Sequence, residues 1–529
     1  GENLLVWTTT PWTLAANVAC AVHPALQYVK VRHNGRAYWL SAGRVEALGL
    51  SDALTDDDPV PGTELVGLGY DGPFDELPAQ AEARERHTVV AWDMVSDEEG
   101  TGIVHIAPGC GREDFELSQE MNLPVIAPID ESGVYEDGYD FLTGKRAQDV
   151  APLVFDSLRE KGLLFAILPY THNYPHCWRC GTALLFRNVG EWFIDMSWRD
   201  EIKRVARQIR WIPEWGLDQE LDWLDNMRDW MISKKRYWGL ALPIWECPDC
   251  GTFDVIGSKE ELRERAVEGW EQFDGHSPHR PWVDCVKIAC PNCGAKTSRI
   301  PDVGNPWLDA GIVPYSTVRY NTDRDYWSKW IPADLVLECF PGQFRNWFYA
   351  LLAMSTMMEN IPPFKTLVGH ALVRDERGDE MHKSKGNAIE FNEAAEKMGV
   401  DVMRWMFCQQ NPVANLNFGY SAGQSIRRTV FNTLWNTYAF FCNYARLDEF
   451  DPRREPVPLD QRTDMDRWIL SNLNILVRTA REAYADFSVH TFVRCAEDFI
   501  EALSNWYVRR NRRRFWRAKD LADLDKLAA

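Results

Sequence analysis

The sequence predicts a multidomain α/β protein with a β-rich first part, a middle part built on a parallel sheet and an α-helical last part. The first observation is length, because 529 residues exceed what one hydrophobic core usually organises, and we expect three or four domains. The second is composition, since 45% hydrophobic and 26% charged residues are typical of globular proteins. The third is apolar spacing, which changes along the chain from strand-like to alternating and then to helical.

The β-rich part extends to about residue 170. Short β-branched and aromatic runs at 26–31, 88–92 and 102–106 are separated by turn residues, as is typical of strands. Near the start, the hydroxyl-rich stretch TTTPWTLAAN (8–17) directly follows an apolar run. Local sequence leaves open whether this stretch is a strand end or a binding loop.

In the middle part, from 177 to about 389, strand patterns alternate with helical ones. This alternation favours a parallel sheet with crossover helices. Residues 245–300 differ because they are rich in cysteine and in turn residues, so we expect a small inserted module there.

After about residue 390 the apolar spacing is helical. We expect Asp401 to cap one helix, and Thr463 with Asp466 to form a capping box that opens another. A third helix is expected at about 492–506, and the arginine-rich run 509–517 extends it.

Charge and cysteine content limit the compartment and the partners. The net charge of −20 disfavours indiscriminate nucleic-acid binding, although a local basic patch remains compatible with it. No apolar run approaches the roughly 20 residues of a membrane span, and the first residues do not resemble a secretory signal. Six of the 13 cysteines fall in Cys-x-x-Cys pairs, which favours metal binding in a reducing compartment. We expect a cytoplasmic protein.

Four of these cysteines predict a metal site. Cys247, Cys250, Cys290 and Cys293 form two Cys-x-x-Cys knuckles, which together supply four thiolates for tetrahedral Zn²⁺. A closed four-thiolate site has a structural role. Cys285 is a possible rival ligand. A third knuckle, formed by Cys177 and Cys180, has no fourth in the chain, so it is a redox pair, a metal half-site or ordinary packing.

Two glycine-bearing loops could carry chemistry. Residues 100–114 read as a strand, a glycine loop and a helix beginning near Asp114. There Asp114 and His105 are suited to a cationic or hydroxyl-bearing ligand, and the alternative is a capping aspartate with a core histidine. Residues 380–387 (EMHKSKGN) form a polar loop whose lysines could stabilise a phosphoryl group, the alternative being a solvated loop.

The arginine-rich run near the end of the sequence has no acidic residue between 509 and 517. Aromatic residues interleave with its arginines, which is compatible with a surface that contacts phosphates. Favourable placement of cations toward a helix C-terminus would explain the same pattern.

In their order, these motifs resemble the class I aminoacyl-tRNA synthetases, and closely the isoleucyl-tRNA synthetase family. TTTPWTLAAN (8–17) and GTGIVHIAPGCGREDF (100–115) resemble its two editing motifs, and DWMISKKRYWG (229–239) resembles a stretch in the second half of its Rossmann fold. MHKS (381–384) resembles the signature ("KMSKS") loop, and NWYVRRNRRRFW (505–516) a stretch of the anticodon-binding domain.

The resemblance implies a domain order. It assigns 1–172 to a β-rich editing domain and 173–392 to the C-terminal half of the Rossmann-type catalytic domain, with a zinc-ribbon-like insertion at about 245–300. It assigns 393–455 to a helical junction that contacts the tRNA stem, and 456–529 to a truncated helical-bundle anticodon-binding domain.

The resemblance also implies an activity. Isoleucine would attack ATP, bound with Mg²⁺, to give an aminoacyl-adenylate, and the ribose of tRNA(Ile) would then take the amino acid. Valyl-tRNA(Ile) would be hydrolysed at the second, editing site, because a single methylene limits discrimination in a hydrophobic pocket, a limit for which this family is itself the standard example. The implied partners are tRNA(Ile), isoleucine and ATP, and we expect a monomer.

The matching positions imply residue roles. Lys383 would stabilise the departing phosphates, and Asp114 would anchor the α-ammonium group during editing. The other implied ATP or adenylate contacts are Glu338, Gln343, His370, Met381 and Ser384. The other implied editing-pocket residues are Thr8, Thr9, Thr10, Thr13 and His105. The implied tRNA contacts are Arg509, Arg510, Arg512, Arg513 and Arg514.

The sequence departs from the family pattern. Glu380 and His382 stand where the signature loop has its first lysine and first serine. The family's His-Ile-Gly-His motif is not in the sequence, and an upstream Cys-x-x-Cys would complete the Cys177–Cys180 site. We therefore expect a fragment that lacks the N-terminal half of the catalytic domain and the C-terminal end, and that cannot activate isoleucine alone. The alternatives are an editing-only hydrolase, a non-catalytic tRNA- or zinc-binding module, and a valyl-tRNA synthetase, which Trp12-Thr13 and the arginine-rich signature disfavour.

Overall fold

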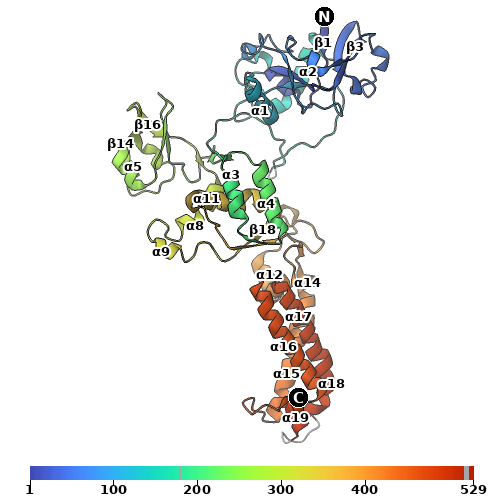
Figure 1. The fold of residues 1–529 in the computed structure, drawn as a ribbon, viewed down its shortest axis with the longest axis vertical. Coiled ribbons are helices and arrows are strands. Elements are labelled where there is room, and N and C mark those ends of the chain that lie inside the picture. Colours follow the sequence, from blue (N-terminus) through green and yellow to red (C-terminus); the bar gives the residue numbers. More distant parts are fainter. Residues whose placement is uncertain (178–179, 517–522) are drawn as a thin grey trace. The chain divides into compact units, whose positions relative to one another are not determined.

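The computed structural model describes residues 1–177, 180–516 and 523–529, with the side chain of Ser384 outside the description. Arg517, expected to extend the last helix, lies outside the described residues. The chain separates into two compact units, Gly1–Gly190 and Glu191–Ala529 (Figure 1). The boundary expected after residue 172 falls inside the first unit, and the finer domain boundaries stay predictions.

Two small sheets form the first unit, with strand orders β1-β4-β3-β5 and β6-β2-β7. Their strands are β1 (Glu2–Leu4), β2 (Ala19–Val22), β3 (Gln27–His33), β4 (Arg36–Ser41), β5 (Val60–Pro61), β6 (Val89–Ala91) and β7 (Ile103–Ile106). β2 pairs parallel with β6 and antiparallel with β7, and the hairpin β3–β4 is antiparallel. The three strand runs predicted from sequence are confirmed as β3, β6 and β7.

Helical segments cover the sheet β6-β2-β7. They are the 3₁₀ helix η1 (Pro11–Ala16) and the α-helices α1 (Arg112–Met121) and α2 (Ala151–Glu160). Pro11 opens η1, where its fixed φ and missing N–H suit a helix start. Trp12 of η1 shares one buried core with Leu117 of α1 and Val154 of α2. This packing fixes the hydroxyl-rich stretch next to the end of β7.

The second unit contains a three-stranded parallel sheet in the order β18-β19-β9. The strands are β9 (Arg210–Ile212), β18 (Val336–Cys339) and β19 (Thr366–His370), and helices α3 (Arg199–Ala206), α4 (Trp215–Asn226) and α11 (Tyr349–Glu359) share its core. The predicted parallel sheet with crossover helices is confirmed. Shorter elements around it are β8 (Phe193–Ile194), β10 (Trp230–Met231), β11 (Ser233–Lys234), β17 (Val303–Gly304), α7 (Pro306–Gly311), α8 (Val313–Ser316), α9 (Arg324–Trp327), α10 (Phe340–Gln343) and the π-helical turn η9 (Phe344–Phe348).

The cysteine-bearing insertion is a five-stranded antiparallel sheet in the order β13-β12-β16-β15-β14. Its elements are β12 (Ile244–Glu246), β13 (Phe253–Val255), α5 (Lys259–Arg265), β14 (Ala266–Glu268), α6 (Trp270–Phe273), β15 (Lys287–Ala289) and β16 (Lys296–Arg299). Because β12 pairs with β16, the hairpins β12–β13 and β15–β16 lie side by side.

After the sheet, the short strand β20 (Val373–Arg374) pairs in parallel with β21 (Leu416–Asn417). The remaining elements are helical: α12 (Phe391–Met398), α13 (Val400–Gln409), α14 (Tyr420–Ile426), η11 (Arg427–Phe431), α15 (Asn432–Leu447), α16 (Asp464–Ala485), α17 (Val489–Glu501), η13 (Ala502–Val508), α18 (Arg509–Trp516) and α19 (Leu524–Ala528). In the described ranges, no helix combines the length and apolarity that crossing a membrane requires.

Two helix-start predictions have different outcomes. The capping box is confirmed, because the Thr463 side chain accepts from the backbone N–H of Asp466 while the Asp466 side chain accepts from that of Thr463. The prediction that Asp401 caps a helix is wrong. Helix α13 begins at Val400, one residue earlier, and its N-cap is Gly399, whose φ of 87° suits a glycine. Asp401 lies in the first turn, where its charge still favours the helix.

Candidate functional site

The first candidate site lies at the end of strand β7, beside η1. A parallel bridge between Trp7 and Val104 places the threonine-rich stretch next to β7. The Thr13 hydroxyl donates to the Thr10 carbonyl at 2.9 Å and lies 2.9 Å from His105 Nε2. The Thr8 hydroxyl accepts from the backbone N–H of Thr10 at 3.1 Å. Three of the four predicted threonines are thus linked to one another.

His105 is buried within this site, and burial lowers its pKa to about 4. The imidazole is therefore neutral near pH 7. Because the Thr13 hydroxyl proton points to a carbonyl, the consistent tautomer has Nε2–H donating to Thr13. Nδ1 is then a free acceptor, and it has no partner among the described residues.

Asp114 joins the same site through the loop between β7 and α1. It lies in the first turn of α1 behind the N-cap Gly111, so the interpretation as a capping residue is wrong. Its Oδ2 accepts from the backbone N–H of Ala107, which directly follows β7, at 2.8 Å. Burial raises the pKa of this carboxyl. Of the predicted editing residues, only Thr9 is exposed.

A second candidate site follows the carboxyl ends of the parallel strands, where ligands bind in open α/β sheets. Glu338 of β18 pairs with Gly369 of β19, and His370 Nε2 lies 4.0 Å from Glu338 Oε1. His370 Nδ1 donates to the Ala371 carbonyl at 2.8 Å, which fixes the ring. Gln343, by contrast, uses its side-chain oxygen to accept from the Trp347 backbone N–H at 3.2 Å.

The signature loop (380–387) follows β20 in the same unit. Lys383 is exposed and begins a 3₁₀ turn that ends at Lys385, while Met381 is half-buried. Ser384 carried a predicted role, and its side chain lies outside the described part of the chain. Glu338 and His370 are thus brought together on adjacent strands, whereas Lys383 belongs to a separate loop.

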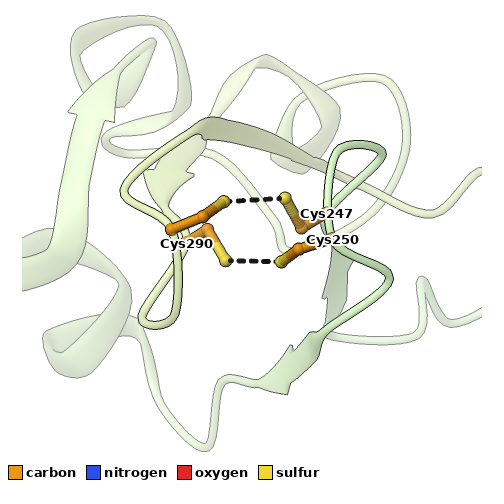
Figure 2. Close-up of side chains that lie close together, drawn as sticks. Cys247, Cys250 and Cys290 are labelled. Carbon is orange, nitrogen blue, oxygen red and sulfur yellow. Dashed lines mark hydrogen bonds between the residues drawn. The ribbon is translucent and has the colours of Figure 1, made fainter.

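Four cysteines converge in the insertion, as the sequence predicts. Cys247 and Cys250 follow β12, and Cys290 and Cys293 follow β15; their sulfur atoms all lie within 4.8 Å of one another. Figure 2 shows Cys247 and Cys250 on one loop pointing toward Cys290 on a facing loop. The Sγ–Sγ distances are 3.5 Å for Cys247–Cys293 and 3.6 Å for Cys250–Cys290. Four thiolates at about 2.3 Å from one zinc ion lie about 3.8 Å apart, so the residues fit this metal. The rival Cys285 is not in the cluster.

All three cysteine knuckles share one backbone pattern. In each knuckle, the backbone N–H of the first cysteine donates to the backbone carbonyl of the residue five positions later. The backbone N–H of the glycine that follows the second cysteine donates to the carbonyl of the first cysteine. This holds for Cys177, Cys247 and Cys290, and the three glycines all have positive φ. Within the described residues, the Cys177–Cys180 knuckle has no metal-ligating cluster around it.

The arginine-rich helix α18 presents a third candidate site. Arg509, Arg510, Arg512 and Arg513 are exposed and line an open hollow of about 620 Å³ together with Phe440, Tyr444 and Trp516. Arg514 differs, because its two terminal nitrogens donate to the buried carboxylate of Asp466 at 2.7 and 2.8 Å. Arg514 thus holds α18 onto α16 through an internal ion pair.

Sequence reasoning missed two residues at the signature loop. Asn387, at the end of the loop, hydrogen-bonds with Glu380 and His382 at its start, and also donates to the carboxylate of Asp375. Asn387 was visible as the last residue of the EMHKSKGN motif, but no spacing rule links it to Asp375, which precedes the loop.

Comparison with known proteins defines the class. The family model "tRNA synthetases class I (I, L, M and V)" matches residues 12–419, and "Anticodon-binding domain of tRNA ligase" matches 466–529. The chain therefore belongs to the class I tRNA synthetases of this group. The individual proteins that it matches include isoleucine–tRNA ligases. That of Methanothermobacter thermautotrophicus is 38% identical over 100% of this chain and 50% of the relative, and that of Thermus thermophilus is 39% identical over 98% and 49%.

The chain thus spans about half the length of the curated relatives it matches. Among solved structures, methionyl-tRNA synthetase of Mycobacterium tuberculosis with methionyl-adenylate covers 67% of this chain at a TM-score of 0.47 and 17% identity. That likeness is too weak to add to the assignment.

Proposed function

We propose that the chain functions in the charging of tRNA(Ile) with isoleucine, as part of an isoleucine–tRNA ligase. The observation that carries this proposal is the 38% identity to an isoleucine–tRNA ligase over the full length of the chain. By matching positions, Glu338 and His370 hold the adenylate, Gln343 supports the turn behind them, and Met381, Lys383 and Ser384 form the loop that faces the phosphates of ATP and its Mg²⁺. Stabilising charge on the leaving phosphates is the chemistry that Lys383 supplies.

Editing of valyl-tRNA(Ile) is the second activity we propose, at the site around β7. Neutral His105 and the linked hydroxyls of Thr8, Thr10 and Thr13 offer hydrogen bonds to a ribose or to an attacking water. Thr9, which is exposed, faces the approaching tRNA. Asp114 provides the negative charge that pairs with an α-ammonium group. Because desolvation raises the Asp114 pKa, an incoming ammonium would also stabilise its ionised form.

The editing role is tested with valyl-tRNA(Ile). Replacing Asp114 with Asn retains an oxygen that can accept from Ala107 N–H, so the loop keeps its hydrogen bond while the charge is lost. We expect Asp114→Asn and Asp114→Ala to reduce the rate of hydrolysis by at least about a hundredfold, which is a loss of about 2.7 kcal/mol of transition-state stabilisation. The measurement is the release of valine from the charged tRNA. Hydrolysis by Asp114→Asn at the parent rate would show that the charge is not the anchor.

An editing-only hydrolase is the second candidate function. It is favoured by one observation: Thr8, Thr10, Thr13, His105 and Asp114 all lie in the compact unit Gly1–Gly190. Exchange of pyrophosphate into ATP in the presence of isoleucine separates the two, because only a chain that forms the adenylate supports it. Exchange together with valyl-tRNA hydrolysis supports a ligase site that is complete in this chain, and hydrolysis alone supports a chain that by itself acts only as an editing hydrolase.

For the metals, we propose that Cys247, Cys250, Cys290 and Cys293 hold a structural Zn²⁺, and that Cys177 and Cys180 provide half of a second site. Bound zinc would join the two hairpins of the insertion. The helix α18, through Arg509, Arg510, Arg512 and Arg513, is proposed to contact tRNA phosphates, with Arg514 positioning that helix.

A further inference from the structure

The signature loop is preceded by a tight hairpin that Asp375 organises. Asp375 Oδ1 accepts from the backbone N–H groups of Arg377 and Asp379, both at 2.9 Å. A β-bridge joins Arg374 to Glu380, so the loop starts where this hairpin closes. Asp375 Oδ2 is left to face the other end of the loop.

The hairpin is itself fixed to the helices that follow. Strand β20 pairs with β21, and the Glu376 carboxylate accepts from the backbone N–H of Ser421 at 2.6 Å at the start of α14. The first end of the loop therefore rests on a frame of several hydrogen bonds.

Asn387, the last residue of the loop, returns to this frame. Its Oδ1 accepts from the backbone N–H of His382 at 2.9 Å. Its Nδ2 donates to Asp375 Oδ2 at 2.9 Å and to the Glu380 carbonyl at 3.1 Å. The donor and acceptor ends of one amide are both used, which a carboxylate of the same shape cannot reproduce because it only accepts. The Asn387 bond is also the leading cause that lowers the pKa of Asp375.

We propose that Asn387 is the positioning residue for Lys383. Its amide closes the eight-residue segment 380–387 into a ring, within which one short turn, Lys383–Lys385, presents the lysine. Gly386, with φ of 69°, makes the reversal that brings Asn387 back. The inference rests on the proposed function, because it takes Lys383 as the group that meets the phosphates.

The test measures binding of ATP and of inorganic triphosphate to the whole chain by calorimetry. We expect Asn387→Ala to weaken binding about tenfold through loss of its hydrogen bonds, and Asn387→Asp to weaken it at least as much, since its carboxylate would face Asp375. Asn392→Ala is the matched control, because Asn392 is an exposed asparagine in the first turn of α12; we expect it to bind as the parent does.

A double-mutant cycle separates positioning from general damage. If Asn387 acts through Lys383, then Asn387→Ala adds no further loss in a Lys383→Ala background. The inference would be overturned if the fold-losses of affinity in the two single variants multiplied in the double variant. Binding by Asn387→Ala that equals the parent's would also overturn it. A parent chain that binds neither probe would overturn the proposed ATP role, and the positioning role with it.

A second measurement follows the loop without any ligand. Trypsin can cut after Lys383 and Lys385, and local opening controls the rate at which it does so. We expect faster cleavage there in Asn387→Ala than in the parent or in Asn392→Ala. Equal cleavage rates in all three proteins would show that the amide does not close the ring.

Discussion

Gly369 lies where β19 passes the buried ring of Phe340. A Cβ built on Gly369 would lie 2.1 Å from two carbon atoms of that ring, and Phe340 is only 2% exposed. The ring is enclosed by the core of the second unit, so it cannot move aside without displacing its neighbours. Because Gly369 has no side chain, β19 can pass this ring while it pairs with β18, and Glu338 and His370 then lie on adjacent strands.

We expect Gly369→Ala to destabilise the chain by about 1–3 kcal/mol, the usual cost of overpacking a core. The measurement is the urea midpoint for unfolding of the second unit. Gly342→Ala serves as the control, because no atom lies within 4 Å of the Cβ it would add. Equal midpoints for the two variants would contradict this account.

At the scale of elements, helix α4 carries a buried acid into the core. Glu220 is fully buried, and neither carboxylate oxygen has a hydrogen-bond partner among the described residues. Trp223 Nε1 on the same helix and the Tyr349 hydroxyl on α11 are likewise unpaired within the described part. Burial raises the pKa of Glu220 well above its usual value, and the pKa of Tyr349 is raised by burial and then by the nearby Glu220.

The sign of the pH dependence follows from this shift. The pKa of Glu220 is higher in the folded state than in the unfolded state. Its contribution to folding stability is therefore fully present below the unfolded pKa and is lost as pH rises through the folded pKa. Between the unfolded and the folded pKa of Glu220, we expect the free energy of unfolding to fall by up to about 1.4 kcal/mol per pH unit. Urea unfolding between about pH 4.5 and the alkaline range measures it, and Glu220→Gln should flatten the curve. The same slope in both proteins would exclude Glu220 as its source.

Helix α18 is anchored by a buried ion pair. Burial opposes the charge of Asp466, but hydrogen bonds from Arg514, Tyr507 and Thr463 outweigh it, so the pKa of Asp466 lies well below its usual range. Arg514→Ala would leave that carboxylate buried and without its cation. We expect a loss of about 3–5 kcal/mol, measured by thermal unfolding, whereas Arg512→Ala on the exposed side should melt with the parent. A small loss for Arg514→Ala would show that the remaining donors suffice.

Local sequence predicted some elements well because their causes are local. The capping box at Thr463 needs only residues three positions apart, and the knuckle at Cys247 only the Cys-x-x-Cys-Gly spacing. The prediction for Asp401 was wrong because Gly399 can adopt the conformation that starts α13 earlier. The role of Arg514 was not predictable, since its partner Asp466 lies 48 positions away and is found only by folding.

At the scale of the whole molecule, the proposed binding of tRNA by a chain with net charge −20 requires a local basic surface. We propose that the four exposed arginines of α18, which line a hollow together with Phe440, Tyr444 and Trp516, are that surface. Each phosphate contact releases counterions, so binding weakens with salt in proportion to the number of contacts.

We expect Arg509→Ala, Arg510→Ala, Arg512→Ala and Arg513→Ala each to reduce the slope of log K against log salt for tRNA(Ile) by about one. Titrations over a series of salt concentrations measure it. Glu482→Ala, an acidic change on α16, serves as a control for general charge. An unchanged slope for all four arginine variants would place the tRNA contacts elsewhere.

Much of the candidate site was predictable because family motifs mark it: the threonines, His105 and Asp114 converge at β7, and the four cysteines converge in the insertion. The positions that sequence could not rank are those whose neighbours decide their role. Thr9 is exposed, while Thr13 in the same motif is buried. The side-chain oxygen of Gln343 accepts a hydrogen bond from the Trp347 backbone N–H in the helical turn that follows it. These differences depend on packing that no spacing rule contains.

The shared backbone pattern of the knuckles bears on how the proposed metal ion would be taken up. Each knuckle closes with its own hydrogen bonds, so each pair of sulfurs is arranged before any ion arrives. The entropic cost of ordering the four-cysteine site is then mostly the cost of bringing two preformed knuckles together. The pairing of β12 with β16 already brings them together. For the proposed zinc site we therefore expect the rate of loading to depend on the arrival of the ion and the departure of thiol protons, without refolding of the insertion.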